Sequence, residues 1–188
     1  MKTSLLLSVA TVAAVVASAG MHPARADLAT IESTCRAGAD AARAADRHFS
    51  PIFCRRRLAA HPGAADADVP GLARIAAVLG AGNADAARHD AGRLLKRSRD
   101  ARYRGALEQC DRLFASVRGA FAAAEAAVVD RRYAAVRDTL ERATDTGFDC
   151  SSAFSSANVG PSPLWNYTID NVQYAFMCIG ITSLINTK

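Results

Sequence analysis

Within residues 103–154 the apolar side chains recur at alternating steps of four and three, and this spacing constrains the fold more than any other feature of the chain. It places one apolar stripe on each of two helices, about 103–128 and 133–154, and such stripes meet in antiparallel bundles with shallow crossing angles. The stripes consist of Tyr103, Leu107, Cys110, Phe114, Val117, Phe121, Ala124 and Val128, then Tyr133, Val136, Leu140, Ala143, Gly147, Cys150 and Phe154.

Two further helices have a similar length. One spans about 69–96, where Leu72, Ala76 and Leu79 share a face and the glycines at 80 and 82 weaken the middle. The other spans about 164–185. Strand signals are poor and aromatic residues make up only 6% of the chain, so small residues must let the helices approach closely. Four helices of about 35–40 Å with short links predict an all-α, up-down-up-down four-helix bundle.

The N-terminal 26 residues have the features of a secretory signal peptide. Lys2 gives a positive start, and Leu5–Ala17 is an apolar run too short to span a membrane. Two candidate cleavage sites, each with small residues at its first and third positions, end at Ala19 and at Ala26. Removal of the signal peptide fits either site. We therefore expect residues 1–26 to be a signal peptide and residues 27–188 to form the secreted domain, with no membrane attachment after cleavage.

The mature chain is mildly basic. Removing Lys2 and Arg25 from a formal net charge of +5 leaves +3. That charge does not demand a nucleic-acid partner, which a secreted protein would not normally meet, but it suits contact with an acidic polysaccharide.

The five cysteines are expected to serve structure rather than chemistry: Cys35, Cys54, Cys110, Cys150 and Cys178. In an oxidising compartment such thiols favour disulfides, and the absence of C-x-x-C pairs and of histidines at ligand spacing argues against zinc. Cys110 and Cys150 each lie twenty residues from the turn near Asp130, which places them level in an antiparallel hairpin. The remaining close pair is Cys35 and Cys54, which leaves Cys178 as a buried free thiol; pairings that involve Cys178 stay open.

Five segments carry a resemblance to a known family: "IESTC", "FSPIFCRRRLAAHPGAADADVPGLARIA", "ALEQC", "RRYAAVRDTL" and "SPLWNYTIDNVQYAFMCIGIT". With the signal and the order of the cysteines, they resemble the plant invertase and pectin methylesterase inhibitor family from about Asp27 to the end. The resemblance implies an N-terminal helical hairpin, about 27–60, held by the first two cysteines. A bundle of about 69–187 follows, with its second and third helices joined by the next two.

The resemblance also implies a function. Family members are secreted inhibitors that lay bundle surface over the active-site cleft of a plant carbohydrate enzyme. One branch targets pectin methylesterases, which remove methyl esters from wall pectin, and the other targets acid invertases, which split sucrose. The invertase branch is associated with a Pro-Lys-Phe tripeptide that this chain lacks. We therefore expect a pectin methylesterase as target in the cell wall; the alternative is an acid invertase, in the wall or the vacuole.

Enzymatic activity is not expected. The chain has no His-Glu-x-x-His, no Gly-x-Ser-x-Gly and no phosphate-binding glycine loop, and its histidines are scattered. We therefore expect no catalytic residue, metal or cofactor. A different class of function, a non-inhibitory pectin-binding or structural helical protein, is suggested by the basic cluster Arg55–Arg57 and by the two glycines of the first bundle helix.

Four residues are candidates for the target interface on the outer faces of the second and third bundle helices: Arg112, Ser116, Asp138 and Glu141. Asn166 begins the sequon Asn-Tyr-Thr and is a candidate for glycosylation. Asn171 lies on the apolar stripe of the last helix, where a buried amide is expected to fix the register.

Overall fold

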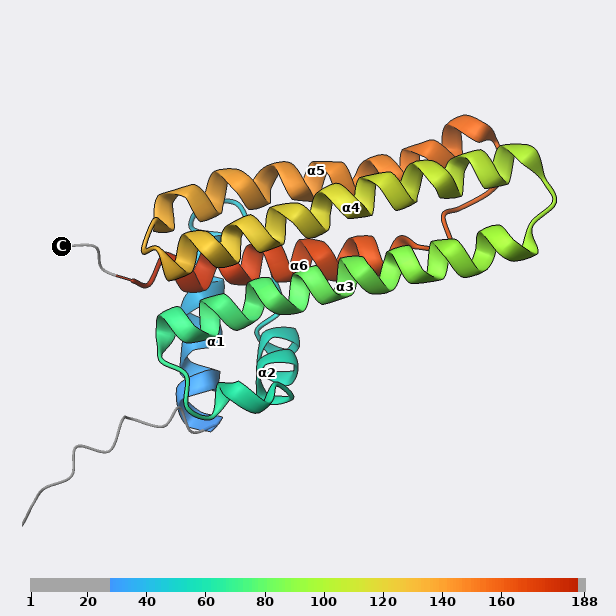
Figure 1. Ribbon diagram of the computed structural model, residues 1–188. Coiled ribbons are helices and arrows are strands. Elements are labelled where there is room, and N and C mark those ends of the chain that lie inside the picture. Colours follow the sequence, from blue (N-terminus) through green and yellow to red (C-terminus); the bar gives the residue numbers. More distant parts are fainter. Residues whose placement is uncertain (1–27, 186–188) are drawn as a thin grey trace, which may run out of the picture.

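The computed structural model describes residues 28–185, and within that range the secondary structure is entirely helical (Figure 1). The signal peptide expected at residues 1–26 lies outside the described residues. The elements are α1 (Leu28–Arg43), α2 (Pro51–Ala59), a 3-10 turn η1 (Pro62–Ala64), α3 (Val69–Arg97), α4 (Ala101–Val129), α5 (Tyr133–Ala157) and α6 (Trp165–Thr182).

Helices α3 to α6 run side by side and alternate in direction, so the predicted up-down-up-down bundle is confirmed (Figure 1). The long helices begin at aspartates that cap them. Asp68 accepts a hydrogen bond from the Gly71 N–H at 2.8 Å. Asp100 accepts from the N–H groups of Arg102 and Tyr103 at 2.8 and 3.1 Å. The last helix is shorter than its periodicity suggested, since it ends at Thr182.

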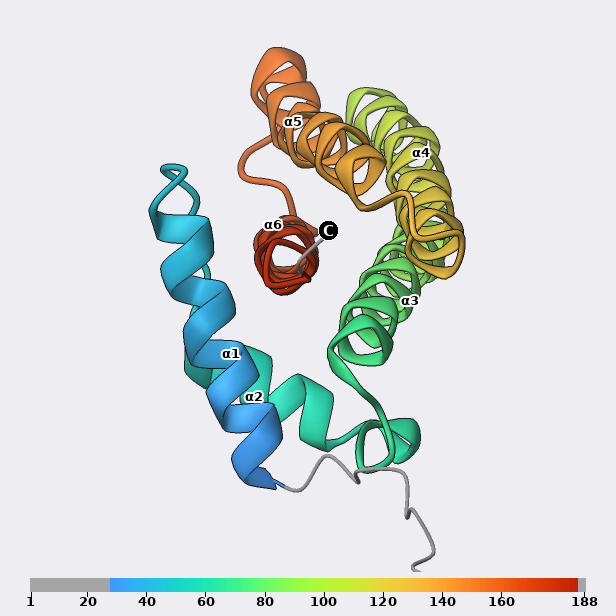
Figure 2. The same ribbon diagram turned by 90° about the vertical axis from the view of Figure 1, so that its left-hand side faces the viewer.

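Helix α6 lies at the centre of the molecule. Viewed along the bundle, it stands between α1 on one side and α3 on the other, and α5 covers it from a third side (Figure 2). Helix α4 instead packs between α3 and α5. The buried residues of α6 are Thr168, Asn171, Tyr174, Ala175, Met177, Cys178, Ile179, Gly180, Ile181 and Thr182.

Two disulfides fix neighbouring helices to each other. Cys110–Cys150 joins α4 to α5 with a Cα–Cα distance of 4.7 Å, and Cys35–Cys54 joins α1 to α2 at 5.8 Å. Chain-entropy arguments assign about 3–4 kcal/mol to loops of this size. Cys178 is a buried free thiol whose Sγ donates to the Ala73 carbonyl oxygen at 3.4 Å. Burial raises the pKa of this thiol to about 12, so it stays protonated and unreactive at neutral pH.

The stripe of α3 differs from the sequence expectation. Leu72 and Ala76 are fully buried, but Leu79 is only half-buried. Small residues supply most of the buried row instead: Ala73, Ala77, Gly80, Ala84, Ala87 and Ala91. Helix α3 is continuous through both glycines, and their weakening effect on its middle stays a prediction. A Cβ at Gly80 would overlap the ring of Phe121 on α4, which means that the glycine makes room for that ring.

The N-terminal hairpin, α1 and α2, packs across the bundle at the end that also holds the C-terminus of α6 (Figure 1). Helix α1 approaches α6 so closely that a Cβ at Gly180 would collide with the carbonyl group of Gly38. Polar contacts secure the second helix of the hairpin: the Ser50 N–H donates to Gln173 Oε1 at 2.8 Å, and Arg57 pairs with Asp170 at 2.8 Å.

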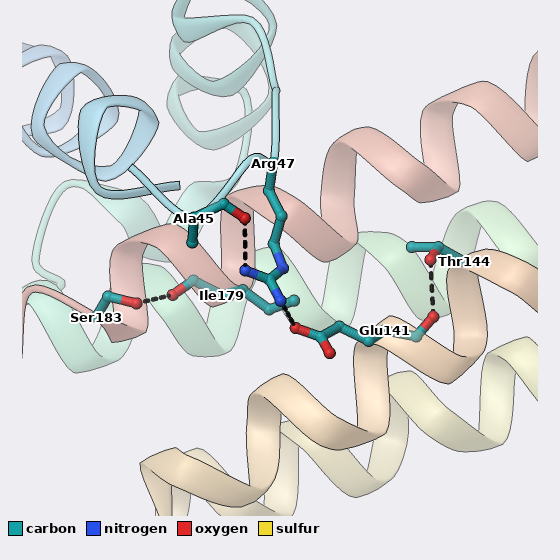
Figure 3. A network of polar contacts seen from close by, with 6 residues as sticks. All are labelled: Ala45, Arg47, Glu141, Thr144, Ile179 and Ser183. Carbon is teal, nitrogen blue, oxygen red and sulfur yellow. Dashed lines mark hydrogen bonds and ion pairs between the residues drawn. The ribbon is translucent and has the colours of Figure 1, made fainter. Parts of the chain in front are cut away.

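The loop between α1 and α2 reaches α5 as well. Arg47 extends from this loop to the carboxylate of Glu141 and also donates to the Ala45 carbonyl oxygen at 2.9 Å (Figure 3). Two nearby hydroxyls form hydrogen bonds within their own segments: that of Thr144 donates to the Glu141 carbonyl oxygen, and that of Ser183 donates to the Ile179 carbonyl oxygen (Figure 3). Close backbone packing and polar contacts thus hold the hairpin on the bundle, and the Cys35–Cys54 disulfide joins its two helices to each other.

Two glycines only two residues apart on α3 provide a matched test of this packing. Replacing Gly80 by Ala is expected to lower the free energy of unfolding by about 1–3 kcal/mol, because the added methyl forces the Phe121 ring to move. Replacing the exposed Gly82 by Ala should raise it by about 0.5–1 kcal/mol, because no atom lies within 4 Å of the new Cβ and Ala favours the helix.

Urea denaturation of both variants measures these differences. Equal stabilisation by both substitutions would contradict the packing role assigned to Gly80.

Candidate interaction surface

In residues 28–185, no group of three or more His, Cys, Asp or Glu side chains is placed to hold a metal ion. Four cysteines are in disulfides and the fifth is buried. No helix in the same range is long and apolar enough to cross a bilayer. A functional site has to be sought on the exposed helix surfaces.

Helix α4 presents an exposed row on the side away from the core. Arg112 and Ser116, about one turn apart, are both exposed and belong to this row; their place in a target interface stays a prediction. The same side is rich in small exposed residues: Gly105, Gly119, Ala122, Ala123 and Ala126. Such residues lose little or no side-chain entropy when they are covered. This side of α4 therefore consists mainly of short side chains, with the Arg112 guanidinium among them.

The side of α4 that faces α3 carries a different chemistry. Three ion pairs join the two helices: Arg74–Glu125 at 2.9 Å, Arg88–Asp111 at 3.0 Å and Arg118–Asp85 at 3.4 Å. Two of these pairs are exposed and Arg88–Asp111 is half-buried. Each contributes at most about 1 kcal/mol, so they support the packing of α4 on α3 without determining it. These contacts and the disulfide to α5 contribute to the orientation of the exposed row.

Helix α5 contributes an acidic row to the same outer surface. Asp138 is exposed, as predicted, and Asp145 and Asp149 follow it at seven and eleven residues along the same side of the helix. No described group forms a hydrogen bond or ion pair with these three carboxylates. Sequence analysis did not single out Asp145 and Asp149, although their position opposite the apolar stripe was a usable signal.

Glu141 lies at the edge of this surface. It is half-exposed and paired with Arg47, so its carboxylate faces the hairpin (Figure 3). The four predicted interface residues also do not gather at one point. The Cys110–Cys150 bond places Arg112 level with residue 148 of α5, about 15 Å along that helix from Asp138. We define the α4–α5 face as Arg112, Ser116, Asp138, Asp145 and Asp149 with the small residues of α4.

An exposed aromatic pair lies at the junction of α5 and α6. The rings of Phe148 and Trp165 are 41% and 45% exposed as residues, with their centroids 6.0 Å apart. The sequence analysis missed this pair. Asn166 follows Trp165 in the first turn of α6 and is exposed, whereas Thr168 of the same sequon is buried and donates to the Gly147 carbonyl oxygen at 3.2 Å.

Asn171 is buried, as expected, and its Oδ1 accepts from Asn83 Nδ2 at 2.9 Å. Asn83 also donates to the Tyr167 carbonyl oxygen, so this pair fixes α3 against α6. The Nδ2 of Asn171 has no partner, so the expected hydrogen bonding is only half fulfilled.

The arginines of α2 are not equivalent. Arg57 pairs with Asp170 and lies over the rings of Phe53 and Tyr174, at 5.1 and 5.8 Å from their centroids. Arg55 and Arg56 remain exposed. The cluster therefore offers a partner two free cations rather than three.

Comparisons with known proteins agree with this architecture. A solved pectin methylesterase inhibitor from Arabidopsis thaliana superposes with a TM-score of 0.58, over 79% of this chain and 97% of that one. At 15% identity this likeness concerns the fold alone.

Other relatives have a higher sequence identity to this chain. Pectinesterase inhibitor 8 of Oryza sativa subsp. japonica is 38% identical over 84% of each chain, and Pectinesterase inhibitor 12 of the same plant is 34% identical over 85% of this chain and 76% of its own. A Platanus orientalis protein named as an invertase inhibitor is 28% identical over 71% of this chain and 78% of its own.

A family model described as plant invertase/pectin methylesterase inhibitor matches residues 29–177, which is most of the chain. The match includes both disulfides, the hairpin and all but the last helical turns of the bundle. The chain therefore belongs to the plant invertase/pectin methylesterase inhibitor family, a family of enzyme inhibitors rather than enzymes.

Proposed function

We propose that this protein inhibits a plant pectin methylesterase by laying the α4–α5 face over the active-site cleft of the enzyme. The observation that carries the choice of target is the order of similarity among relatives. The two rice proteins named pectinesterase inhibitors are 38% and 34% identical to this chain, and the Platanus proteins named as invertase inhibitors are 28% identical.

The geometry of the α4–α5 face supports a role in binding. Its two helices are joined by the disulfide Cys110–Cys150, and three ion pairs connect α4 to α3. A surface fixed in this way loses little conformational freedom when a partner covers it. The unpaired carboxylates of Asp138, Asp145 and Asp149 then contribute charge complementarity and rate of association more than affinity.

Inhibition of an acid invertase is the second candidate. It is favoured by the Platanus relatives, which match 71% of this chain. The Pro-Lys-Phe tripeptide associated with that branch is absent from the sequence, which places invertase behind pectin methylesterase.

Purified protein added to a panel of both enzyme classes tests the proposal. We expect loss of pectin methylesterase activity at protein concentrations near that of the enzyme, with invertase activity unchanged. The assay is to be run from acidic to neutral pH. Inhibition of invertase alone would make invertase the target and refute inhibition of pectin methylesterase. No inhibition of either class across a broad panel would refute both proposals.

The binding face is tested by a bulky, charged residue placed in the exposed row of α4. Replacing Ser116 by Arg is expected to weaken inhibition by about tenfold or more, because a long side chain separates two surfaces that must meet closely. Ala86, exposed on α3, provides a control with the same new side chain. The inhibition constants of both variants are compared. Equal values would contradict the assignment of the interface to α4.

Secretion and glycosylation complete the proposal. The apolar run near the N-terminus supports a cleaved leader, and the exposed Asn166 supports a glycan at the start of α6. Protein recovered from the medium of plant cells should begin after residue 19 or residue 26 and carry a mass that falls after amidase treatment and in the variant Asn166→Gln. Retention of residues 1–19 would contradict the leader, and an unmodified mass would contradict the glycan.

A further inference from the structure

The positive charge of the described chain is concentrated at one turn. Residues 28–185 contain 20 Lys and Arg against 17 Asp and Glu. Five of these basic residues and one acidic residue lie in the nine residues 96–104, where α3 turns into α4. The rest of residues 28–185 then holds 15 basic and 16 acidic side chains, so outside this turn the surface is close to neutral.

Four of the cations form no salt bridge with a described residue. Lys96, Arg97, Arg99 and Arg102 are exposed, and of the four only Arg102 acts electrostatically on a neighbouring carboxylate, that of Asp100. We call these four residues the basic turn. It lies at the end of the bundle opposite to the hairpin and to the C-terminus of α6 (Figure 1).

The two remaining charged groups hold the turn in place. Arg104 is half-buried and its Nη1 donates to the carbonyl oxygens of Leu95 and Ser98, at the end of α3. Asp100 is the cap of α4, and the N–H groups that it accepts from, that of Tyr103 foremost, lower the pKa of its carboxyl. The four exposed cations therefore project from a hydrogen-bonded turn.

Helix stability accounts for only half of this charge. Lys96 and Arg97 lie in the last turn of α3, where cations favour the negative end of the helix dipole. Arg99 lies beyond that helix, and Arg102 lies in the first turn of α4, where the dipole disfavours a cation. Arg102 is partly compensated by the nearby carboxylate of Asp100, whereas Arg99 has no such role in the fold. The excess charge that helix stability does not explain indicates a role in binding.

We propose that the basic turn binds an acidic polysaccharide through the carboxylates of its sugar residues. Guanidinium groups pair with carboxylates through two parallel hydrogen bonds, and a row of them suits a chain that carries one carboxylate per sugar. The choice of polymer rests on the proposed function, because a pectin methylesterase converts neutral esters in pectin into such carboxylates. Arg102 lies about 15 Å along α4 from Arg112, so the polymer would run beside the α4–α5 face.

Other arginine groups fit a polyanion less well. In the cluster on α2, Arg57 is occupied by Asp170 and two aromatic rings. A cavity of about 630 Å³ near the α4–α5 turn is lined by three arginines, but one of them, Arg132, pairs with Asp130 at 2.9 Å. The sequence-based assignment of polysaccharide contact to Arg55–Arg57 is thus replaced by the basic turn.

Binding of the purified folded protein to polygalacturonate, without enzyme, tests the proposal. The protein is expected to bind the de-esterified polymer, to bind highly methyl-esterified pectin much more weakly, and to be released as salt screens the contacts. A variant with Lys96→Gln, Arg97→Gln, Arg99→Gln and Arg102→Gln should bind at least ~10-fold more weakly, the combined loss of four exposed ion pairs.

The matched control removes four positive charges elsewhere, at exposed positions: Arg55→Gln, Arg56→Gln, Arg131→Gln and Arg137→Gln. It should weaken binding by less than ~3-fold, because the basic turn is intact. Circular dichroism checks the fold of both variants, and the double variant Arg99→Gln, Arg102→Gln, expected to keep full stability, replaces the fourfold variant if that one fails to fold.

Equal losses in the fourfold variant and its control would overturn the proposal, since net charge alone would then explain the binding. Equal affinity for esterified pectin, or tighter binding to phosphatidylserine-containing vesicles or to duplex DNA, would overturn it as well. Polymer binding without enzyme inhibition would support the basic turn and refute the proposed function, and inhibition without polymer binding would do the reverse.

Discussion

The close approach of helices across small residues is the constraint on which this fold depends. Because Gly80 lacks a side chain, the ring of Phe121 packs against the backbone of α3, and the alanines along the same row keep α3 and α4 close over their length. Gly38 and Gly180 do the same where the hairpin crosses α6. A chain with few aromatic residues reaches a dense core in this way, since short side chains lose no contacts when the backbones themselves are near.

Because of this packing, α4 and α5 each use part of their surface for contacts within the bundle and leave another part exposed. Helix α4 buries its apolar stripe, forms ion pairs with α3 on one flank and a disulfide with α5 at the core, and still leaves one side free of intramolecular contacts. Helix α5 is arranged similarly: Glu141 belongs to the hairpin contacts, and the three aspartates on its outer side have no partner. The residues that stabilise the bundle are therefore distinct from those available to a target.

Much of the architecture was predictable from the sequence because it depends on local spacing. The stripes of α4 and α5 and the equal distances of Cys110 and Cys150 from the turn follow from periodicity, and the structure contains both. The row of α3 was misjudged, because hydrophobicity ranks Leu79 above Gly80 while the space beside Phe121 admits only the glycine. The contact between Arg47 and Glu141 joins residues 94 apart and depends on how the hairpin is placed, which no local pattern encodes.

The charged residues of the surface also divide into two groups: those that are paired within the fold and those that are not. On α3 and α4 most acids have basic partners, and such balance lowers long-range attraction to polyanions. The excess cations are confined to the α3–α4 turn, at the N-terminal end of α4. Ions in solution screen exposed charges over about 10 Å at 0.1 M salt, and Arg112 lies about 15 Å along α4 from Arg102. A polymer at the turn and a charged group bound at Arg112 would therefore affect each other little electrostatically. Two partners of different chemistry can thus be served by one helix, because its rigid length, and not a flexible linker, sets the distance between their sites.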